Sequence, residues 1–296
     1  MPCRNREMDG GFKRSKMKKW HLVIDVAKCE NCNNCFLACK DEHVDNHWPG
    51  YSAPQPNQGE SWINIEGKER GLYPFIDVAY LPIPCMHCDN APCMKAAQDG
   101  AIYKRPDGTV IIDPVKAKGQ KKIVSACPYG AMSWNETLDV PQKCTFCAHL
   151  LDEGWKKTRC LQSCPTGALT MRHVEDAEMK KIIEAEKLEV YQPQYMTEPR
   201  VYYKNLYRFT RCFIGGSIAV RLSGKDECVE GAKVTVINAS NEKIGECITD
   251  NYGDFKFDNL EENSGNYTLR IVHRGYAEKS VEVNLKKSLY TGVIFL

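Results

Sequence analysis

Twelve cysteines between residues 29 and 164 constrain the fold of this chain more than any other feature of its sequence. The first four follow the pattern C-x2-C-x2-C-x3-C, a run that holds 4Fe–4S clusters in bacterial proteins. In such a run three thiolates hold one cluster, and the fourth reaches across to a second cluster. The cysteines fall into four groups: Cys29, Cys32, Cys35 and Cys39; Cys85, Cys88 and Cys93; Cys127 alone; and Cys144, Cys147, Cys160 and Cys164.

Exchange of the last cysteine between paired groups predicts three complete cluster sites. The first and fourth groups have four cysteines each, so they can exchange Cys39 and Cys164. The second group lacks a fourth cysteine, which Cys127 can supply. The predicted ligand sets are site A, with Cys29, Cys32, Cys35 and Cys164; site B, with Cys144, Cys147, Cys160 and Cys39; and site C, with Cys85, Cys88, Cys93 and Cys127.

The same rule requires a fourth site, but its ligand positions hold no cysteine. Those positions, named here the replaced site, are Ala97, Ala117, Gln120 and Ile123. All four missing cysteines belong to this one site, whereas sites A, B and C keep every ligand. We therefore predict three 4Fe–4S clusters.

Zinc is the competing interpretation, because C-x2-C pairs also occur in all-thiolate zinc sites. Zinc ribbons use isolated pairs, and they lack the longer run and the proline that follows Cys127 and Cys164 here. The pattern therefore favours iron–sulfur clusters. His87 and His149 lie beside cysteines, but cysteines already fill every site. We expect both histidines to be neighbours of the sites or surface residues, not ligands.

Four cysteines lie outside these groups. Their scattered placement is typical of small buried hydrophobic residues for Cys212, Cys228 and Cys247, and of a disordered thiol for Cys3. We predict no role for them in metal binding.

The chain is long enough for about two domains at roughly 100–200 residues each. The cysteine runs predict an α+β fold of paired ferredoxin-like modules. From about residue 213, apolar and polar residues alternate between closely spaced turn signals, which predicts a small β-sandwich or barrel. The expected parts are a disordered basic extension at 1–18, a cluster domain at 19–173 with a long surface loop at 40–84, a helix and extended aromatic arm at 174–211, and an all-β domain at 212–296.

Aromatic residues mark both the loop and the arm. Trp48, Tyr51 and Trp62 in the loop either cover a cluster, contact a partner, or pack on their own domain. In the arm, Pro193 and Pro199 exclude a continuous helix. Its many tyrosines indicate an ordered segment that packs on the cluster domain or on another subunit.

Charge and hydropathy exclude several classes of partner. The formal net charge is only +2, which gives no electrostatic case for nucleic acid. No stretch approaches the roughly 18 apolar residues that span a bilayer. The basic first residues lack the apolar core of an export signal. We therefore expect a cytoplasmic protein without nucleic-acid or membrane partners.

With the cysteines placed, the chain resembles the iron–sulfur subunits of the dimethyl-sulfoxide-reductase superfamily of molybdopterin oxidoreductases. Within it, the chain is most similar to the small (beta) subunits of the pyrogallol–phloroglucinol transhydroxylase type. The motifs that carry the resemblance are VIDVAKCENCNNCF, DEHVDNHWPGY, PCMHCDNAPC, IDPVKAKGQKK, CPYGAM, QKCTFCAHLLD and PRVYYKNLYRF. The β-domain is similar to transthyretin-like, Ig-like or carboxypeptidase-regulatory modules, through EGAKVTVIN, TDNYGDFKF and GNYTLRI.

The resemblance implies that this chain is an electron-transfer subunit and not the catalytic one. The implied partner is a large catalytic subunit that carries a molybdenum–bis-pterin cofactor and acts on polyhydroxylated aromatic rings. A soluble electron carrier is a further expected partner. The active site would lie in the large subunit, whose reaction could be transhydroxylation, hydroxylation or dehydroxylation.

Three alternatives remain open from the sequence. The chain could be a free-standing polyferredoxin, which would leave the arm and the β-domain without a use. It could be the iron–sulfur subunit of a different molybdopterin oxidoreductase. It could also be a structural protein whose clusters only hold the fold together. A co-purifying large subunit and reversible reduction of the clusters would separate these possibilities.

Overall fold

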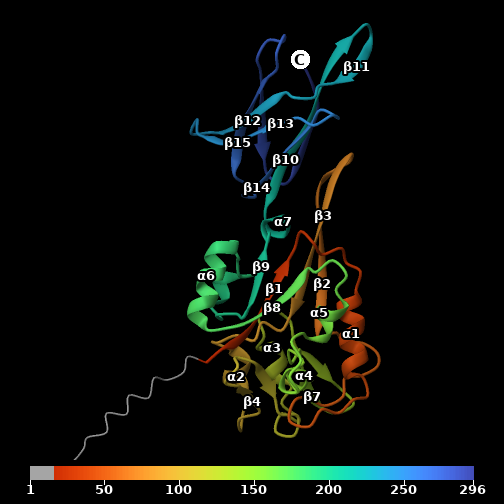
Figure 1. Ribbon diagram of the computed structural model, residues 1–296, viewed down its shortest axis with the longest axis vertical. Coiled ribbons are helices and arrows are strands. Elements are labelled where there is room, and N and C mark those ends of the chain that lie inside the picture. Colours follow the sequence, from red (N-terminus) through yellow and green to blue (C-terminus); the bar gives the residue numbers. More distant parts are fainter. Residues whose placement is uncertain (1–16) are drawn as a thin grey trace, which may run out of the picture.

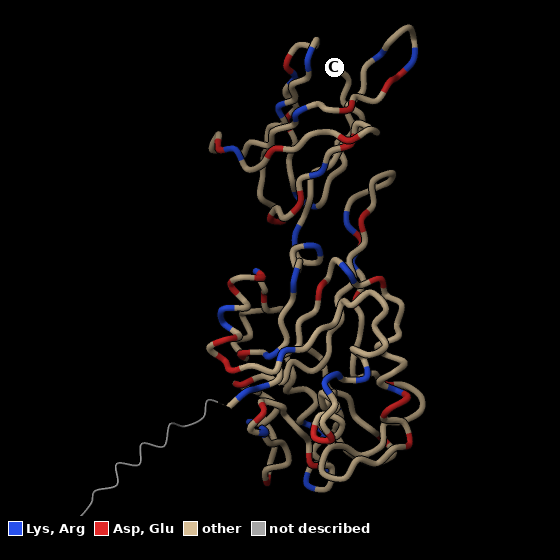
Figure 2. The backbone as a smooth tube through the Cα atoms, viewed as in Figure 1, with Lys and Arg blue, Asp and Glu red and all other residues tan. Residues whose placement is uncertain are grey.

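The computed structural model describes residues 17–296, which form two lobes, and the long strand β10 (Cys212–Leu222) begins at the waist between them (Figure 1). We call residues 17–211 the cluster lobe and residues 212–296 the β-domain. Residues 1–16 of the predicted basic extension, with Cys3, lie outside the described residues. Within residues 17–296, no helix is both long enough and apolar enough to cross a membrane. Acidic and basic residues are interspersed over both lobes (Figure 2).

A three-stranded sheet holds the two ends of the cluster lobe together. Strand β1 (Lys19–Asp25) lies between β8 (Leu169–Val174), to which it is antiparallel, and β9 (Val201–Lys204), to which it is parallel. The centre of β1 is buried. Because β1 leads directly into Cys29 and β8 follows shortly after Cys164, this pairing brings the first and last cysteines of the region close together.

The other elements around the cysteines are short, because the chain turns sharply between successive cysteines. Two small two-stranded sheets, β4 with β5 and β6 with β7, and five short helices fill this part of the lobe. The helices, and the strands β4 to β7, are α1 (Asn34–His43), α2 (Pro92–Ala96), β4 (Ile102–Lys104), β5 (Val110–Ile112), α3 (Lys122–Ser125), β6 (Ser133–Asn135), β7 (Val140–Gln142), α4 (Ala148–Asp152) and α5 (Arg159–Ser163).

Left-handed backbone conformations create the turns between cysteines. Asn31 and Asn33 have φ values of 54° and 60° within the first run. His87 (45°), Phe146 (53°) and Cys147 (45°) take the same conformation in the second and fourth groups. Asparagine adopts this conformation more readily than most residues. For the others the surrounding structure must hold it in place.

The structure corrects the prediction of one long surface loop at 40–84. Helix α1 continues to His43, and only about residues 44–62 are irregular. Residues beyond them form a hairpin of β2 (Ile63–Leu72) and β3 (Phe75–Pro84), paired along its whole length. The charged and glycine-containing sequence of β2 has weak strand propensity, so its pairing with β3 and its packing decide the conformation.

The arm packs on the cluster lobe, one of the two possibilities predicted for it. It begins after α6 (Asp176–Glu186), which lies within the predicted helical segment. The arm contains the short helix η1 (Pro193–Tyr195), strand β9 and helix α7 (Tyr207–Thr210). Tyr203 is fully buried, and its hydroxyl donates a hydrogen bond of 2.9 Å to the carbonyl of Pro82.

The β-domain consists of two four-stranded sheets that enclose one apolar core, as the alternating pattern predicted. Strand β10 pairs with β11, β14 and β17 in the first sheet, and the second sheet has the order β13-β12-β15-β16. The strands are β10 (Cys212–Leu222), β11 (Lys225–Cys228), β12 (Lys233–Asn238), β13 (Lys243–Ile248), β14 (Asp254–Leu260), β15 (Gly265–Val272), β16 (Lys279–Leu285) and β17 (Leu289–Phe295).

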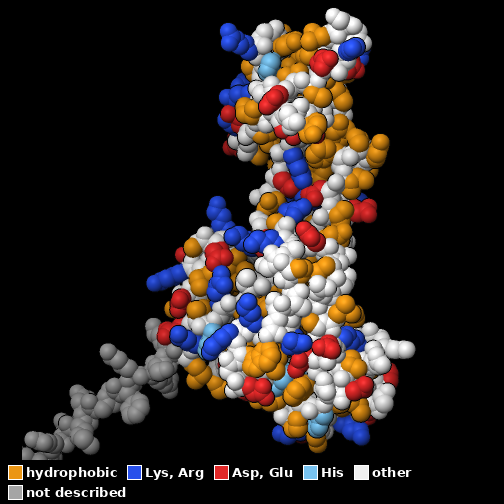
Figure 3. Space-filling model, turned by 45° about the vertical axis from the view of Figure 1, so that its right-hand side comes forward, with side chains coloured by type: hydrophobic (Ala, Val, Ile, Leu, Met, Phe, Trp, Pro, Cys, Tyr) orange, Lys and Arg blue, Asp and Glu red, His pale blue; other side chains and the backbone are white. Residues whose placement is uncertain are grey.

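The β2–β3 hairpin connects the two lobes. Arg70, which is 3% exposed, pairs with Asp77 on the hairpin and donates to Asp258 of the β-domain at 2.8 Å. The ring of Phe75 stacks on Tyr290, with centroids 5.7 Å apart. Oppositely charged side chains therefore gather at the narrow waist of the molecule (Figure 3). These contacts hold the β-domain against the hairpin.

Candidate metal centres

Site C has the simplest geometry, because all four of its predicted ligands line one cavity. Cys85, Cys88 and Cys93 come from one segment, and Cys127 joins them from the end of α3. The cavity is otherwise lined mainly by apolar side chains, including Met86 and Met132. The structure therefore brings together the two sequence groups that the exchange rule paired.

Site B lies in a second cavity of the same kind. Cys144, Cys147 and Cys160 line it together with Cys39, which stands more than a hundred positions earlier in the sequence. Burial raises the pKa of the Cys39 thiol well above its usual value, and the charges of Cys144 and Cys147 raise it further. The structure therefore brings Cys39 together with three cysteines of the fourth group.

Site A is closer to the surface than the other two sites. Cys32 is exposed, Cys29 and Cys164 are half-buried, and only Cys35 is buried. Burial raises the pKa of Cys29, and the charge of Cys164 adds to this effect. Cys164 therefore lies near Cys29, although the rest of its own group belongs to site B. Leu37, two residues after Cys35, is 58% exposed.

The three sites follow one another in a row. Burial raises the pKa of Cys35 in site A to about 12, with Cys160 of site B as the next cause. Burial likewise raises the pKa of Cys144 in site B to about 12, and Cys85 of site C contributes to the rise. Site B thus lies between site A and site C.

The donor sets fit iron–sulfur clusters chemically. Burial raises the pKa of Cys88 to about 12 and that of Cys93 to about 11, so these thiols stay protonated without a bound cation. Iron supplies the positive charge that makes buried thiols bind as thiolates. Within residues 17–296, no group of three or more His, Cys, Asp or Glu side chains has the arrangement of a site for a single metal ion.

The replaced site is filled by side chains. Ala117 and Ile123 are fully buried in the core, and Ala97 packs against the same core. The Gln120 side chain accepts a hydrogen bond of 2.9 Å from the backbone N–H of Gln98 and donates one of 2.7 Å to the Lys116 carbonyl. Apolar packing and hydrogen bonds therefore connect the two segments that ligands would otherwise connect.

His87 and His149 are both neighbours of the sites, and neither is on the surface. His87 is completely buried and lines the cavity of site C. His149 is 4% exposed, and its Nε2 lies 2.9 Å from Glu42 Oε1. The ring of Trp48 stacks on His149, with centroids 4.1 Å apart.

The irregular segment 44–62 lies against site B. Trp62 is 3% exposed and lines the site B cavity beside His43, while its indole Nε1 has no hydrogen-bond partner among residues 17–296. Tyr51 donates a hydrogen bond of 2.5 Å to Asp152. Of the roles predicted for these aromatic residues, packing on their own domain is thus observed, and Trp62 also lines the cavity of a site.

Two features near site C were not predicted from the sequence. Lys143 is 3% exposed, and its ammonium group donates to the carbonyl oxygens of Val110 and, at 3.1 Å, of Cys144. Its only sequence signal is its position directly before a cysteine. The buried lysine places a positive charge beside both site B and site C.

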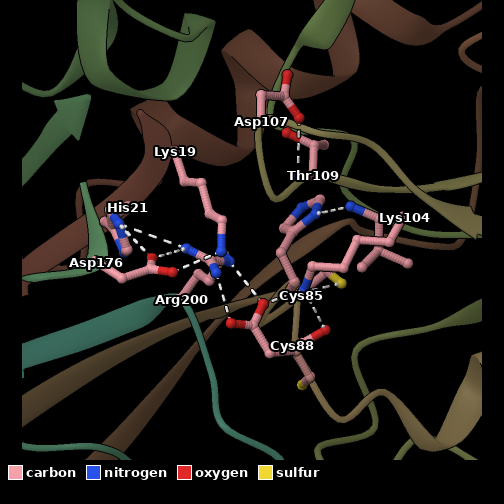
Figure 4. A network of polar contacts seen from close by, with 12 residues as sticks. Lys19, His21, Cys85, Cys88, Lys104, Asp107, Thr109, Asp176 and Arg200 are labelled. Atoms are coloured by element: carbon pink, nitrogen blue, oxygen red, sulfur yellow. Dashed lines mark hydrogen bonds and ion pairs between the residues drawn. The ribbon is translucent and has the colours of Figure 1, made fainter. Parts of the chain in front are cut away.

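The second unpredicted feature is an ion network between site C and the surface (Figure 4). Lys104 donates to the Cys88 carbonyl at 2.8 Å and pairs with Asp89. Arg200, only 2% exposed, holds Asp89 through Nη2 at 2.5 Å and Asp176 through Nη1 at 3.1 Å. No motif marks this network, because its members come from segments far apart in the sequence.

Comparison with known protein families finds one matching domain model in each lobe. A family model described as a 4Fe-4S dicluster domain matches residues 76–174. A model described as a carboxypeptidase regulatory-like domain matches residues 217–294, within the β-domain.

Several relatives match more than half of this chain. The small subunit of pyrogallol hydroxytransferase from Pelobacter acidigallici is 47% identical over 95% of this chain and 100% of its own length. The iron–sulfur subunit of arsenate respiratory reductase from a Shewanella strain is 28% identical over 62% of this chain and 94% of its own. One polypeptide of the anaerobic dimethyl sulfoxide reductase from Escherichia coli is 34% identical over 55% of this chain and 77% of its own length.

Proposed function

Because this chain is a member of the family of pyrogallol hydroxytransferase small subunits, we propose that it is an electron-transfer subunit that holds three 4Fe–4S clusters at sites A, B and C. The observation that supports this most strongly is that cysteines from separate groups in the sequence line the same cavities. Cys127 lines the same cavity as the second group, and Cys39 lines the same cavity as part of the fourth. Three donor sets of four thiols would hold about twelve irons per chain.

Clusters held at these sites would supply one-electron transfer. The residues of the chain would bind iron through thiolates and keep water away from it. The cavities of sites B and C are lined by buried side chains such as Met86, Phe146 and Trp62. Such surroundings set the reduction potential, because burial and hydrogen bonding to sulfur decide how well the reduced state is stabilised.

The substrate chemistry belongs, in this proposal, to a large partner subunit with a molybdenum–bis-pterin cofactor that acts on polyhydroxylated aromatic rings. The name of the 47% identical relative, a hydroxytransferase small subunit, supports this assignment. Site A would face the partner, since Cys32 and the large apolar side chain of Leu37 are exposed there. A covering subunit would remove both from water.

At the other end, beyond site C, the surface carries lysines over the replaced site. Residues 114–135 contain four lysines and no acidic residue, and Lys116, Lys118, Lys121 and Lys122 are all exposed. Complementary charge speeds the encounter of partner proteins. We therefore assign this face to an acidic, soluble electron carrier and expect a cytoplasmic complex. Recovery of the native complex mainly in the membrane fraction of lysed cells would contradict this part of the proposal.

Anaerobic purification of the native complex tests the main proposal. We expect about twelve irons and about twelve sulfides per chain, a large molybdenum-containing subunit in the same peak, and clusters that dithionite reduces reversibly. Tightly bound zinc with little iron would contradict the cluster assignment. Iron–sulfur protein without a large subunit would favour a free-standing polyferredoxin, and clusters that resist reduction would favour a structural role.

The reaction of the large subunit distinguishes the proposal from the remaining alternative, a different molybdopterin oxidoreductase. Turnover of a polyhydroxybenzene by the purified complex supports the proposed reaction class. Activity only toward unrelated substrates, with the same iron content, would show that this is the iron–sulfur subunit of a different molybdopterin oxidoreductase.

A further inference from the structure

His87 is a buried histidine with one ring nitrogen that the protein does not use. It stands between Cys85 and Cys88, and its φ of 45° directs the chain through the left-handed region. The side chain is completely buried, and its ring packs on Phe146 with centroids 3.8 Å apart. Burial and packing on Phe146 therefore hold the ring in place.

A hydrogen bond to the backbone determines the tautomer of this ring. The N–H of Val110 donates to His87 Nδ1 at 3.0 Å, so Nδ1 acts as the acceptor. In a neutral imidazole the other nitrogen then carries the proton, and Nε2 becomes an N–H donor. This Nε2 has no hydrogen-bond partner in the described part of the chain. The carbonyl of Cys144 lies near enough to act on the pKa of the ring, but it makes no hydrogen bond of normal geometry with it.

His87, which carries this unpaired donor, lines the site C cavity. His87 and Val110 line that cavity together with all four cysteines of site C. The other buried nitrogen there, Lys143 Nζ, already donates to two carbonyl oxygens. Buried N–H groups are rarely left without an acceptor in folded proteins. A sulfur atom in the cavity would satisfy Nε2.

We propose that His87 Nε2–H donates a hydrogen bond to a sulfur of the cluster held at site C and thereby raises the reduction potential of that cluster. This inference rests on the proposed function, since it needs a cluster at site C. Reduction adds negative charge to the cluster sulfurs, so a fixed donor stabilises the reduced state more than the oxidised state. His87 is thus a positioning and tuning residue, and cysteines remain the ligands.

Two substitutions separate the hydrogen bond to Val110 from the hydrogen bond to sulfur. In His87→Asn the side-chain oxygen can still accept from the Val110 N–H, but no donor reaches the place of Nε2. In His87→Gln the longer side chain can place an N–H near that position. His149→Asn is the matched control, because His149 is also buried next to a cysteine run but its Nε2 already faces Glu42.

The measurement is a redox titration of the native complex, followed by electron paramagnetic resonance, with the signal of site C identified by its loss in Cys127→Ala. In His87→Asn with full iron content, we expect the ratio of reduced to oxidised site C at a fixed potential to fall about tenfold, which is ~59 mV for a one-electron couple. His87→Gln should recover much of this shift, and His149→Asn should leave site C unchanged. An unchanged potential in iron-replete His87→Asn would overturn the inference.

Wild-type protein whose histidines carry 15N only in the imidazole ring decides the matter if the variants lose iron, because the backbone N–H of His87 itself lies 3.5 Å from Cys85 Sγ. A histidine ring nitrogen coupled to the reduced site C cluster in pulsed resonance spectra supports the hydrogen bond. Absence of that coupling contradicts it. If the chain held no clusters at all, the wild-type protein itself would lack iron. That result is distinct from the absence of nitrogen coupling in iron-replete protein.

Discussion

Site C and the replaced site are the two halves of one paired module, and they have opposite interiors. Site C keeps four cysteines around a cavity, whereas the replaced site has Ala117 and Ile123 packed at zero exposure. Helices α2 and α3 pack against each other in this module. One half of the module thus has a cavity lined by four cysteines, and the other half is held together by apolar packing and by the hydrogen bonds of Gln120.

If the replaced site once held a cluster, as the spacing rule predicts, this difference indicates how such a site is lost while the fold is kept. Removal of all four ligands leaves no buried thiol behind, so no unpaired reactive group remains. The space is closed by apolar side chains, and interior packing of this kind is as dense as elsewhere in proteins. We therefore expect the half around site C to need iron for its structure, and the half around the replaced site to fold without it.

The largest effect is expected at site C itself. Cys127→Ala removes the ligand that crosses from the third group, so the chain should retain about eight irons instead of about twelve. Iron analysis and the resonance spectrum of the anaerobic protein measure this loss. Cys212→Ala, at a buried cysteine in the β-domain, should keep all the iron. Full iron content in Cys127→Ala would contradict the ligand set of site C.

The crossing rule allows a similar test at site B. Cys39→Ala should alter the cluster that Cys144, Cys147 and Cys160 hold, because Cys39 lines their cavity. The signal of site A should persist, even though Cys39 follows the site A cysteines in sequence. Loss of the site A signal with site B intact would show that the fourth cysteine of each run stays with its own group.

A substitution in the replaced site should have the opposite effect. It should lower the free energy of unfolding and leave the iron content unchanged. Ile123→Ala creates a cavity in a fully buried position, and such changes cost about 2–5 kcal/mol. Iron content should stay at about twelve per chain. Anaerobic urea unfolding measures the free energy, with Val115→Ala as the control, since Val115 is 84% exposed. Iron loss in folded Ile123→Ala protein would show that the two halves are not independent.

The sequence predicted which cysteines lie together better than it predicted what surrounds them. Spacing alone paired Cys127 with the second group and Cys39 with the fourth, because tight C-x2-C turns restrict where thiolates can point. It did not predict the β2–β3 hairpin, whose conformation depends on contacts such as Arg70 with Asp258. Nor could it predict the unpaired His87 Nε2, which depends on Val110 from a distant strand.

Gln120 offers a smaller test of how the replaced site is closed. From a partly exposed position, its amide group forms hydrogen bonds with the backbone of Gln98 and of Lys116. Gln120→Ala should therefore cost about 1 kcal/mol, the net value of an ordinary hydrogen bond. In Gln98→Ala the backbone atoms that take part remain, so the unfolding free energy should change by less than ~0.5 kcal/mol. Equal effects in the two variants would rule out a specific role for the Gln120 side chain.

The smallest effect on the folded protein is expected at the lysines that cover the replaced site. Lys118 and Lys122 are exposed, so replacing both with glutamine should leave iron content unchanged and shift stability by less than ~0.5 kcal/mol. The rate of electron exchange with an acidic carrier, such as a ferredoxin or flavodoxin, should nevertheless fall, because steering by complementary charge can speed association by about 10–10³-fold. Stopped-flow mixing at several salt concentrations measures this, since salt screens exposed charges over about 10 Å at 0.1 M. In wild-type protein the rate should fall steeply as salt rises, and in the double variant the dependence should be weaker.

Lys279 and Lys286, on the distant β-domain, provide a control of equal charge, and replacing them should change neither the rate nor its salt dependence. Equal salt dependence in wild-type and Lys118/Lys122 variants would show that the face over the replaced site is only solvated, and that electrons leave the row of sites elsewhere.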